Sequence, residues 1–202
     1  MKSLNVSEIF YSIQGEGGRA GTPTVFIRLQ GCKTKHACFK AGIICDTEFE
    51  SGQSMRIDEL RDLIIAIAPK CKDITWTGGE PLDQLDDEIA RYFKELGYHQ
   101  SIETSGLRAK ISEINYWTVS PKVAEHIVSK NFGEDEIDEL RYVRHHGQSI
   151  PAPALKARRK YVSPHSDGYE INRENLKHCI ELIKAHPDWK LSVQQHKLWN
   201  VL

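Results

Sequence analysis

The sequence has no long hydrophobic run and no excess of charge of one sign. Without a stretch of about 18 apolar residues, no segment of the 202-residue chain is expected to span a membrane. The 27 lysines and arginines nearly balance the 28 aspartates and glutamates, which argues against broad binding to nucleic acid or to an acidic membrane surface. The first five residues lack the apolar core of a signal peptide, so we expect a cytoplasmic protein.

Cysteine is scarce, and its number is odd. Of the five cysteines, Cys32, Cys38 and Cys45 fall within fourteen residues. Thiols stay reduced in the cytosol, so this grouping indicates metal binding or catalysis and not a disulfide framework. The sequence lacks the Cys-x2-Cys pairs that are typical of structural zinc sites, although His36 could act as a fourth ligand. Three thiolates favour a four-iron cluster with one iron left open for a ligand.

Predicted strands alternate with predicted helices along the chain. Segments with apolar residues on one helical face predict helices at 57–68, 84–96 and 172–186. Short apolar segments predict strands at 25–29, 73–77, 101–104, 116–119, 140–143, 160–162 and 189–193. This alternation is typical of a parallel sheet. Since 202 residues are few for eight βα units, we expect an α/β fold with an incomplete barrel, formed by a single domain over residues 1–202.

Polar or glycine-bearing turns follow one predicted strand after another. They are Gly31-Cys32, Gly78-Gly79, Ser105-Gly106, Ser120-Pro121-Lys122 and Ser163-Pro164. The C-terminal ends of parallel strands meet at one rim, where barrel-like α/β enzymes keep their active sites. The sequence therefore predicts a site at this rim.

The turn Thr77-Gly78-Gly79-Glu80-Pro81 has a structural and a functional interpretation. Taken alone, it suits an ordinary strand-to-helix turn, in which glycine tolerates positive φ and proline opens the helix. Two glycines also let the amino-acid group of a ligand approach the backbone, and Glu80 could orient its ammonium. Beside the three cysteines, the turn points to an enzyme that makes a radical from S-adenosylmethionine.

Other polar residues are open to both interpretations. Gln14 and Glu16 lie between glycines in a polar segment that suits a turn or the binding of a nitrogen-rich ring. Arg28 lies inside an apolar strand, so it needs a carboxylate from the protein or from a ligand. Cys71 and Cys179 are expected in the core.

The order of these motifs resembles the 7-carboxy-7-deazaguanine synthase family of radical S-adenosylmethionine enzymes. The resemblance extends over nearly the whole chain, through residues 8–17, 21–23, 26–32, 45–47, 77–81, 103–106 and 120–122. The Gln-Gly-Glu-Gly and Cys-Asp-Thr segments are specific, whereas Gly-Gly-Glu-Pro is shared with other radical enzymes. A related radical enzyme with another substrate and a metal-stabilised binding protein without turnover are the alternatives.

The resemblance implies a reaction and its cofactors. A reduced [4Fe–4S] cluster would cleave S-adenosylmethionine to a 5′-deoxyadenosyl radical, which takes a hydrogen from 6-carboxy-5,6,7,8-tetrahydropterin. Ring contraction and loss of ammonia would give 7-carboxy-7-deazaguanine, a precursor of queuosine. The resemblance also implies a homodimer, an electron donor such as flavodoxin, and Mg2+ held through Thr47 at the substrate carboxylate.

Residue roles follow from the matching positions. Cys32 and Cys45 match the first and third cluster ligands, and Cys38 is the choice for the second because Gly42 occupies the expected cysteine position. The positions that match S-adenosylmethionine contacts are Ile44, Cys45, Asp46, Gly78, Gly79, Glu80, Ser120, Pro121, Lys122, Ser163, Pro164, His165 and Ser166. The last four replace the more usual Gln-Pro-Met-Asp. The positions that match substrate contacts are Ile13, Gln14, Gly15, Glu16, Arg28, Thr77, His196 and the C-terminal Leu202.

Overall fold

The computed structural model describes residues 2–40, 42, 45, 50–134, 136–166 and 168–201. Its strands are β1 (Ser3–Ile13), β2 (Pro23–Leu29), β3 (Gln53–Arg56), β4 (Asp73–Gly78), β5 (His99–Thr104), β6 (Tyr116–Val119), β7 (Glu139–Arg144), β8 (Arg159–Pro164) and β9 (Lys190–Leu191). Its helices are α1 (Lys35–Lys40), α2 (Ile57–Ile67), α3 (Asp87–Glu95), α4 (Glu125–Val128), α5 (Arg173–Ala185) and α6 (Gln195–Trp199), with 3-10 turns η1 (Gly17–Arg19) and η2 (Pro81–Asp83).

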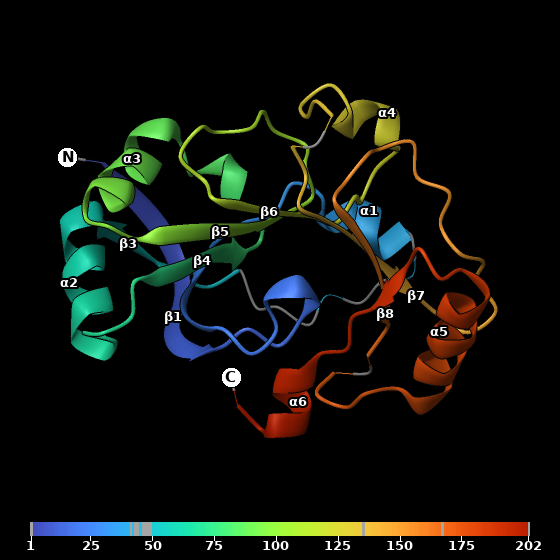
Figure 1. Ribbon diagram of the computed structural model, residues 1–202. Helices are drawn as coiled ribbons and strands as arrows, with labels where there is room; N and C mark the ends of the chain where they lie inside the picture. The colour runs from blue at the N-terminus through green and yellow to red at the C-terminus, as the bar shows by residue number, and fades with distance from the viewer. Residues whose placement is uncertain are drawn as a thin grey trace.

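These strands form one twisted sheet in the order β3-β1-β2-β4-β5-β6-β7-β8-β9. Every neighbouring pair from β2 to β9 is parallel, whereas β1 runs antiparallel to both β2 and β3. Helices α2 and α3 lie beside one end of the sheet and α5 beside the other (Figure 1). Within the described residues β3 and β9 are free edges of the sheet, so the barrel is incomplete, as predicted.

The predicted central strands are confirmed, and the corrections concern the ends of the sheet. The sequence did not predict β1 or β3, and the expectation of a parallel sheet is wrong for these two strands. The register of β1 against β2 shifts between Val6 and Glu8, which interrupts the alternation that would mark a strand in the sequence. The last strand, β9, has two residues instead of the five predicted.

Three helices were predicted, with small errors at their ends. Helix α3 begins at Asp87 because η2 precedes it and because Asp86 caps it, accepting bonds from Glu88 N (3.1 Å) and Ile89 N (3.0 Å). Asn172 caps α5 as expected, through Asn175 N at 2.9 Å. Among the described residues, no helix has the length and apolar character needed to cross a bilayer.

The central strands place apolar residues on one face and mostly polar residues on the other. Val25, Ile27, Leu29, Ile74, Trp76 and Ile102 pack in one core cluster with buried residues of α2 and α3. The alternate positions carry Phe26, Arg28, Thr75, Thr77, Ser101 and Glu103, which must face away from these helices. Cys71 packs at the margin of this core. Cys179, in α5, is buried in a second cluster, so both cysteines are core residues as predicted.

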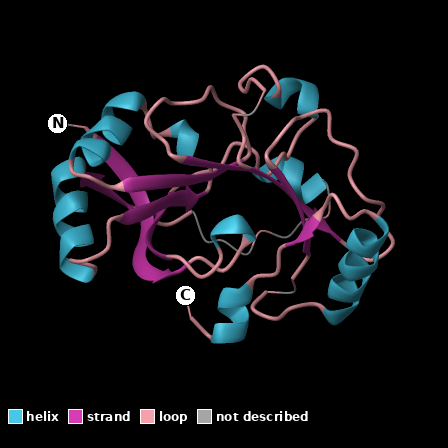
Figure 2. Cartoon of the chain, in the orientation of Figure 1, coloured by secondary structure: helices cyan, strands magenta, loops and turns pink. Residues whose placement is uncertain are grey.

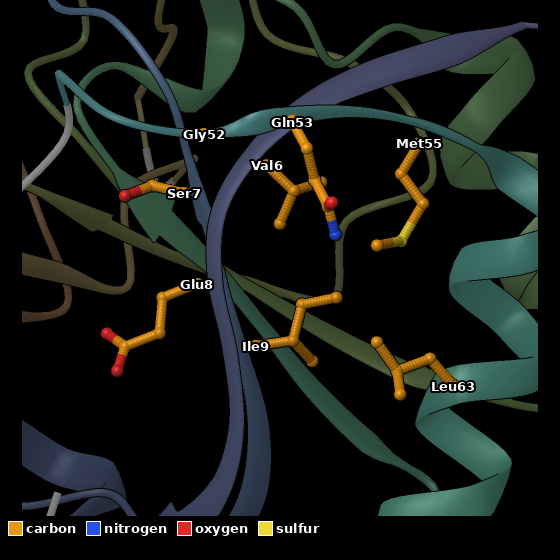
Figure 3. A pocket seen from close by; sticks show the side chains of 8 residues that line it. All are labelled: Val6, Ser7, Glu8, Ile9, Gly52, Gln53, Met55 and Leu63. Carbon is orange, nitrogen blue, oxygen red and sulfur yellow. The ribbon is translucent and has the colours of Figure 1, made fainter.

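A pocket lies on the helix side of β1, between β1, β3 and α2 (Figure 3). In Figure 3, Ile9 points toward Leu63 and Met55, whereas Glu8 points to the opposite side of the strand. None of the predicted cysteine, glycine-turn or Gln14 positions lines this pocket. The predicted site therefore does not lie in this pocket.

Candidate active site

The glycine turn after β4 lies directly against the cysteine loop after β2. Gly79 N donates to Leu29 O at 2.9 Å, and Glu80 N donates to Gly31 O at 2.9 Å. A Cβ atom on Gly79 would lie 1.8 Å from Gly31 O, which leaves no room for any other residue. Gly78 has a φ of +111°, and a Cβ there would lie 2.3 Å from Leu29 N. The two turns thus form one rigid rim, as the sequence predicted for adjacent parallel strands.

Three free cysteines lie in and after this loop. Cys32 and Cys38 are half-buried and Cys45 is exposed. Burial raises the pKa of the Cys38 thiol; the positive charge of Lys122 opposes this shift, and Cys32 and Cys45 reinforce it. Lys122 and the other two thiols therefore lie close enough to Cys38 to influence its pKa.

The cysteine loop is ordered locally by threonine. The Sγ atom of Cys32 lies 3.0 Å from Thr34 Oγ1, and Cys38 N donates to Thr34 O at 3.2 Å at the start of α1. Among the described residues, no three histidine, cysteine or acidic side chains are arranged closely enough to hold a metal ion. Ile44, Asp46 and Thr47, three predicted contacts in this loop, lie outside the described residues, as does Leu202.

Glu80 is buried and joins two turns of the rim. The residue is 2% exposed, and its carboxylate accepts bonds from Leu82 N (3.2 Å), Thr104 Oγ1 (2.6 Å), Ser105 N (2.9 Å) and the Ser105 hydroxyl. Each carboxylate oxygen therefore receives two bonds from the protein, which matches its usual capacity. Glu80 fixes the end of β5 to the glycine turn, and its predicted contact with a ligand ammonium stays a prediction.

A polar network centres on Glu103, on the face of the sheet away from α2 and α3. Gln14 Nε2 donates to Glu103 Oε1 at 3.2 Å, and Thr77 Oγ1 donates to Glu103 Oε2 at 3.2 Å. Gln14 Oε1 in turn accepts a bond from Glu16 N at 3.0 Å. The structure thus brings together three predicted substrate contacts from the loop after β1 and from β4.

Glu103 and Arg141, which contacts it, were not among the residues predicted from the sequence to bind a ligand. Arg141 Nη1 lies 3.0 Å from Glu16 Oε2 and 3.4 Å from Glu103 Oε1. One signal was present for Glu103: it alternates with the apolar Ile102 in a predicted strand and so had to face away from the core. Arg141 alternates with the apolar Leu140 in the predicted strand 140–143 in the same way, but its partners are distant in the sequence.

Arg28 pairs with a carboxylate of the protein, which is one of the two partners that its place in an apolar strand predicted. Glu8 lies directly across from it in the β1–β2 register, and Arg28 Nη1 donates to Glu8 Oε2 at 2.9 Å. The guanidinium also lies over the Phe10 ring, 4.9 Å from the centroid. The Arg28 side chain remains 30% exposed, so further N–H donors of its guanidinium stay accessible. Its contact with a substrate carboxylate stays a prediction.

The C-terminal segment packs on the loop after β1 (Figure 2). Gln195 N donates to Gly15 O at 3.0 Å, and Gly17 N donates to Ser192 Oγ at 3.0 Å. A Cβ atom on Gly15 would lie 2.3 Å from His196 Nδ1. Helix α6 therefore brings His196 to the same loop as Gln14 and Glu16, although 180 residues separate His196 from Glu16.

The remaining predicted cofactor contacts lie at the ends of β6 and β8. Ser120 N donates to Thr104 O at 2.8 Å, beside the turn held by Glu80. His165 stacks on His145, with ring centroids 4.2 Å apart, and Ser166 Oγ donates to Gln194 Oε1 at 2.8 Å. Each of these residues follows a parallel strand at the predicted rim.

Comparison with known proteins identifies the family. No family model matches the chain. The chain is 36% identical over 199 residues to 7-carboxy-7-deazaguanine synthase of Bacteroides thetaiotaomicron, with 97% of each chain covered. This protein belongs to the 7-carboxy-7-deazaguanine synthase family. The synthase of Burkholderia multivorans is 33% identical over 213 residues, with 97% of this chain and 98% of that one covered.

The fold of the synthase family is also seen in a solved structure. The crystal structure of QueE from Escherichia coli superimposes with a TM-score of 0.68 and covers 95% of this chain and 94% of that chain, at 22% identity. This similarity confirms the α/β architecture with a partial barrel. Membership in the synthase family implies radical chemistry with an iron–sulfur cluster and S-adenosylmethionine.

Proposed function

We propose that this protein is a radical S-adenosylmethionine lyase that converts 6-carboxy-5,6,7,8-tetrahydropterin to 7-carboxy-7-deazaguanine with loss of ammonia, in the biosynthesis of queuosine. One observation carries the proposal: Gln14, Thr77 and Glu103 form a hydrogen-bonded set on the face of the sheet whose rim holds the cysteine loop. We take residues 1–202 as one catalytic domain.

The described residues include side chains and turns of the kinds that bind the proposed cofactors. Cys32, Cys38 and Cys45 would hold three irons of a [4Fe–4S] cluster, because three thiols that form no disulfide lie in and after the loop beside the glycine turn. When bound, the reduced cluster and S-adenosylmethionine supply the radical that removes a hydrogen atom from the substrate. The turns at Gly79, Ser120-Pro121-Lys122 and 163–166 would hold the methionine and nucleoside parts, and Lys122 adds a positive charge near the thiols.

The network around Glu103 suits a pterin. A pterin carries N–H donors and a carbonyl acceptor along one edge, and an amide beside a carboxylate offers the complementary set. Gln14 and Glu103 provide this pair, and Glu16 N–H already orients the Gln14 amide. Arg28 would bind the substrate carboxylate with the donors that Glu8 leaves accessible.

The same proposal includes Mg2+ and the partners. The hydroxyl of Thr47 is an oxygen ligand of the kind that Mg2+ prefers, and it would join the ion to the substrate carboxylate. We propose a homodimer in the cytoplasm, reduced by an electron donor such as flavodoxin. Helix α1 carries Cys38 and exposes Phe39, at 83%, beside Lys35 and Lys40, a combination that suits an acidic flavoprotein.

A product assay tests the function. The cluster is reconstituted without oxygen, and dithionite, S-adenosylmethionine, Mg2+ and 6-carboxy-5,6,7,8-tetrahydropterin are added before mass spectrometry. We expect 7-carboxy-7-deazaguanine, and none from a Cys32→Ala control. Brown protein with verified iron that makes no product would contradict the proposed substrate, and colourless protein that holds zinc would contradict the radical chemistry.

A further inference from the structure

Arg141 is a buried cation surrounded by three carboxylates. Its side chain, from β7, is 8% exposed, and its Nη2 atom lies 3.5 Å from Glu139 in addition to the contacts of Nη1 with Glu16 and Glu103. Burial works against its charge, but Glu16, Glu103 and Glu139 together outweigh burial and raise the pKa of the guanidinium. A permanent positive charge therefore lies beneath the network that contains Gln14.

The three carboxylates are not equivalent. Glu139 is 1% exposed and also accepts bonds from Gly18 N (3.0 Å) and Tyr116 OH (2.8 Å), so it anchors the guanidinium within the protein. Glu16 and Glu103 are more accessible, at 16% and 26% of their side-chain surface. Arg141 thus connects one interior carboxylate with two that face the candidate site.

We propose that Arg141 is a positioning residue for substrate binding, because its single Nη1 atom bridges Glu16 and Glu103 and fixes the distance between them. Glu16 comes from the loop after β1 and Glu103 from β5, and like charges so close together repel each other without a cation between them. Loss of the bridge would release Glu103 from Gln14 and Thr77. This inference rests on the proposed function, since it assigns the pterin as the molecule that the two carboxylates meet.

Two Arg141 variants and a matched control test the proposal. Arg141→Met removes the charge and the bridge, and Arg141→Lys keeps the charge without the planar fork of donors. Arg158→Met is the control, because Arg158 is 63% exposed and pairs with Asp138 at 3.1 Å, whereas Arg141 contacts Glu16, Glu103 and Glu139. All three proteins are compared with the wild type after reconstitution to equal iron content.

The readouts separate positioning from a role in stability alone. For Arg141→Met we expect the KM for the pterin to rise by about tenfold or more, the change that loss of a charge-assisted hydrogen bond produces. We also expect more 5′-deoxyadenosine than product, because a loosely held substrate lets the radical be quenched. Arg141→Lys should fall between the wild type and Arg141→Met, and Arg158→Met should match the wild type in both readouts.

A double variant tests the charge argument itself. Removing the charge of Glu16 by Glu16→Gln in the Arg141→Met background lowers the repulsion, so the fold-increase in KM should be smaller than the product of the two single fold-increases, which is less than additive in free energy. Additive effects would contradict the bridge. If Arg141→Met does not fold, Arg141→Lys tests the bridge instead: it keeps the charge but loses the fork of donors, so its KM for the pterin should exceed that of the wild type, and a wild-type KM would overturn the bridge.

Two results separate failure of this inference from failure of the proposed function. An active wild type with an unchanged KM and an unchanged ratio of 5′-deoxyadenosine to product in Arg141→Met would overturn the positioning role. An inactive wild type would overturn the proposed function. In that case equal binding of the fluorescent probe 6-carboxypterin by the wild type and Arg141→Met would overturn the positioning role separately.

Discussion

Glu80 and Ser105 are joined twice, since the Glu80 carboxylate accepts both the backbone N–H of Ser105, at 2.9 Å, and its hydroxyl. The two residues lie in the turns that follow neighbouring strands, β4 and β5, and Glu80 is almost completely buried. The rim of the partial barrel is therefore fixed by a carboxylate that belongs to the Gly-Gly-Glu-Pro turn. This relationship gives Glu80 a structural role beside the one that its motif predicts.

The first prediction concerns this carboxylate. Glu80→Gln replaces one acceptor oxygen by an NH2 group that faces other donors, so the free energy of unfolding of the metal-free protein should fall by about 2 kcal/mol. Chemical denaturation measures the change. Glu181→Gln, at an exposed position of α5, is the control and should change stability little. Equal stability of Glu80→Gln and the wild type would show that the buried bonds contribute nothing.

Gly79 gives a second prediction. The Cβ atom of Gly79→Ala would overlap Gly31 O, so the cysteine loop must move. We expect a loss of about 1–3 kcal/mol in stability and a lower iron content after reconstitution. Gly133→Ala is the control, because its nearest neighbour would lie 3.4 Å away. Full iron content in Gly79→Ala would mean that the loop adapts without cost to the cluster.

The third prediction tests the unusual cysteine spacing. Cys38→Ala should lose most of its iron and its brown colour, whereas Cys71→Ala, which changes a cysteine at the margin of the core, should retain both. Iron analysis and the visible spectrum measure the difference. Retention of a complete cluster in Cys38→Ala would show that another residue is the second ligand.

A fourth prediction concerns pH. Burial raises the pKa of Cys179 to about 11, from 9.0 for an ordinary cysteine, so the folded protein keeps the neutral thiol. Above pH 9 the unfolded chain loses this proton while the folded chain retains it, and stability should fall until the pH passes about 11. Cys179→Ala should show a shallower loss over that interval when unfolding is measured against pH. An identical slope in both proteins would contradict the shifted pKa.

The central strands and the motifs were predictable because their signals are local. Apolar runs that end in glycine, serine or proline identified β2, β4 and β5 to β8, and the order of parallel strands placed Gly79 beside the cysteine loop. Glycine is needed at position 79 because a Cβ atom there would overlap the backbone of Gly31. This steric requirement depends only on two short segments of the chain. The sequence by itself therefore determined the fold class and the rim, whereas the choice of cluster cysteines stays a prediction.

Only the tertiary structure decided the antiparallel position of β1, the contact of α6 with Gly15, and the charge network. The bond from Arg141 to Glu16 spans 125 residues, and the bond to Glu103 spans 38. A single glutamate or arginine in a strand has the same local pattern whether it meets solvent, a ligand or another charge. Partner choice depends on the strand order and on the low polarity of the interior, which makes an unpaired charge costly, and neither is present in any short stretch of sequence.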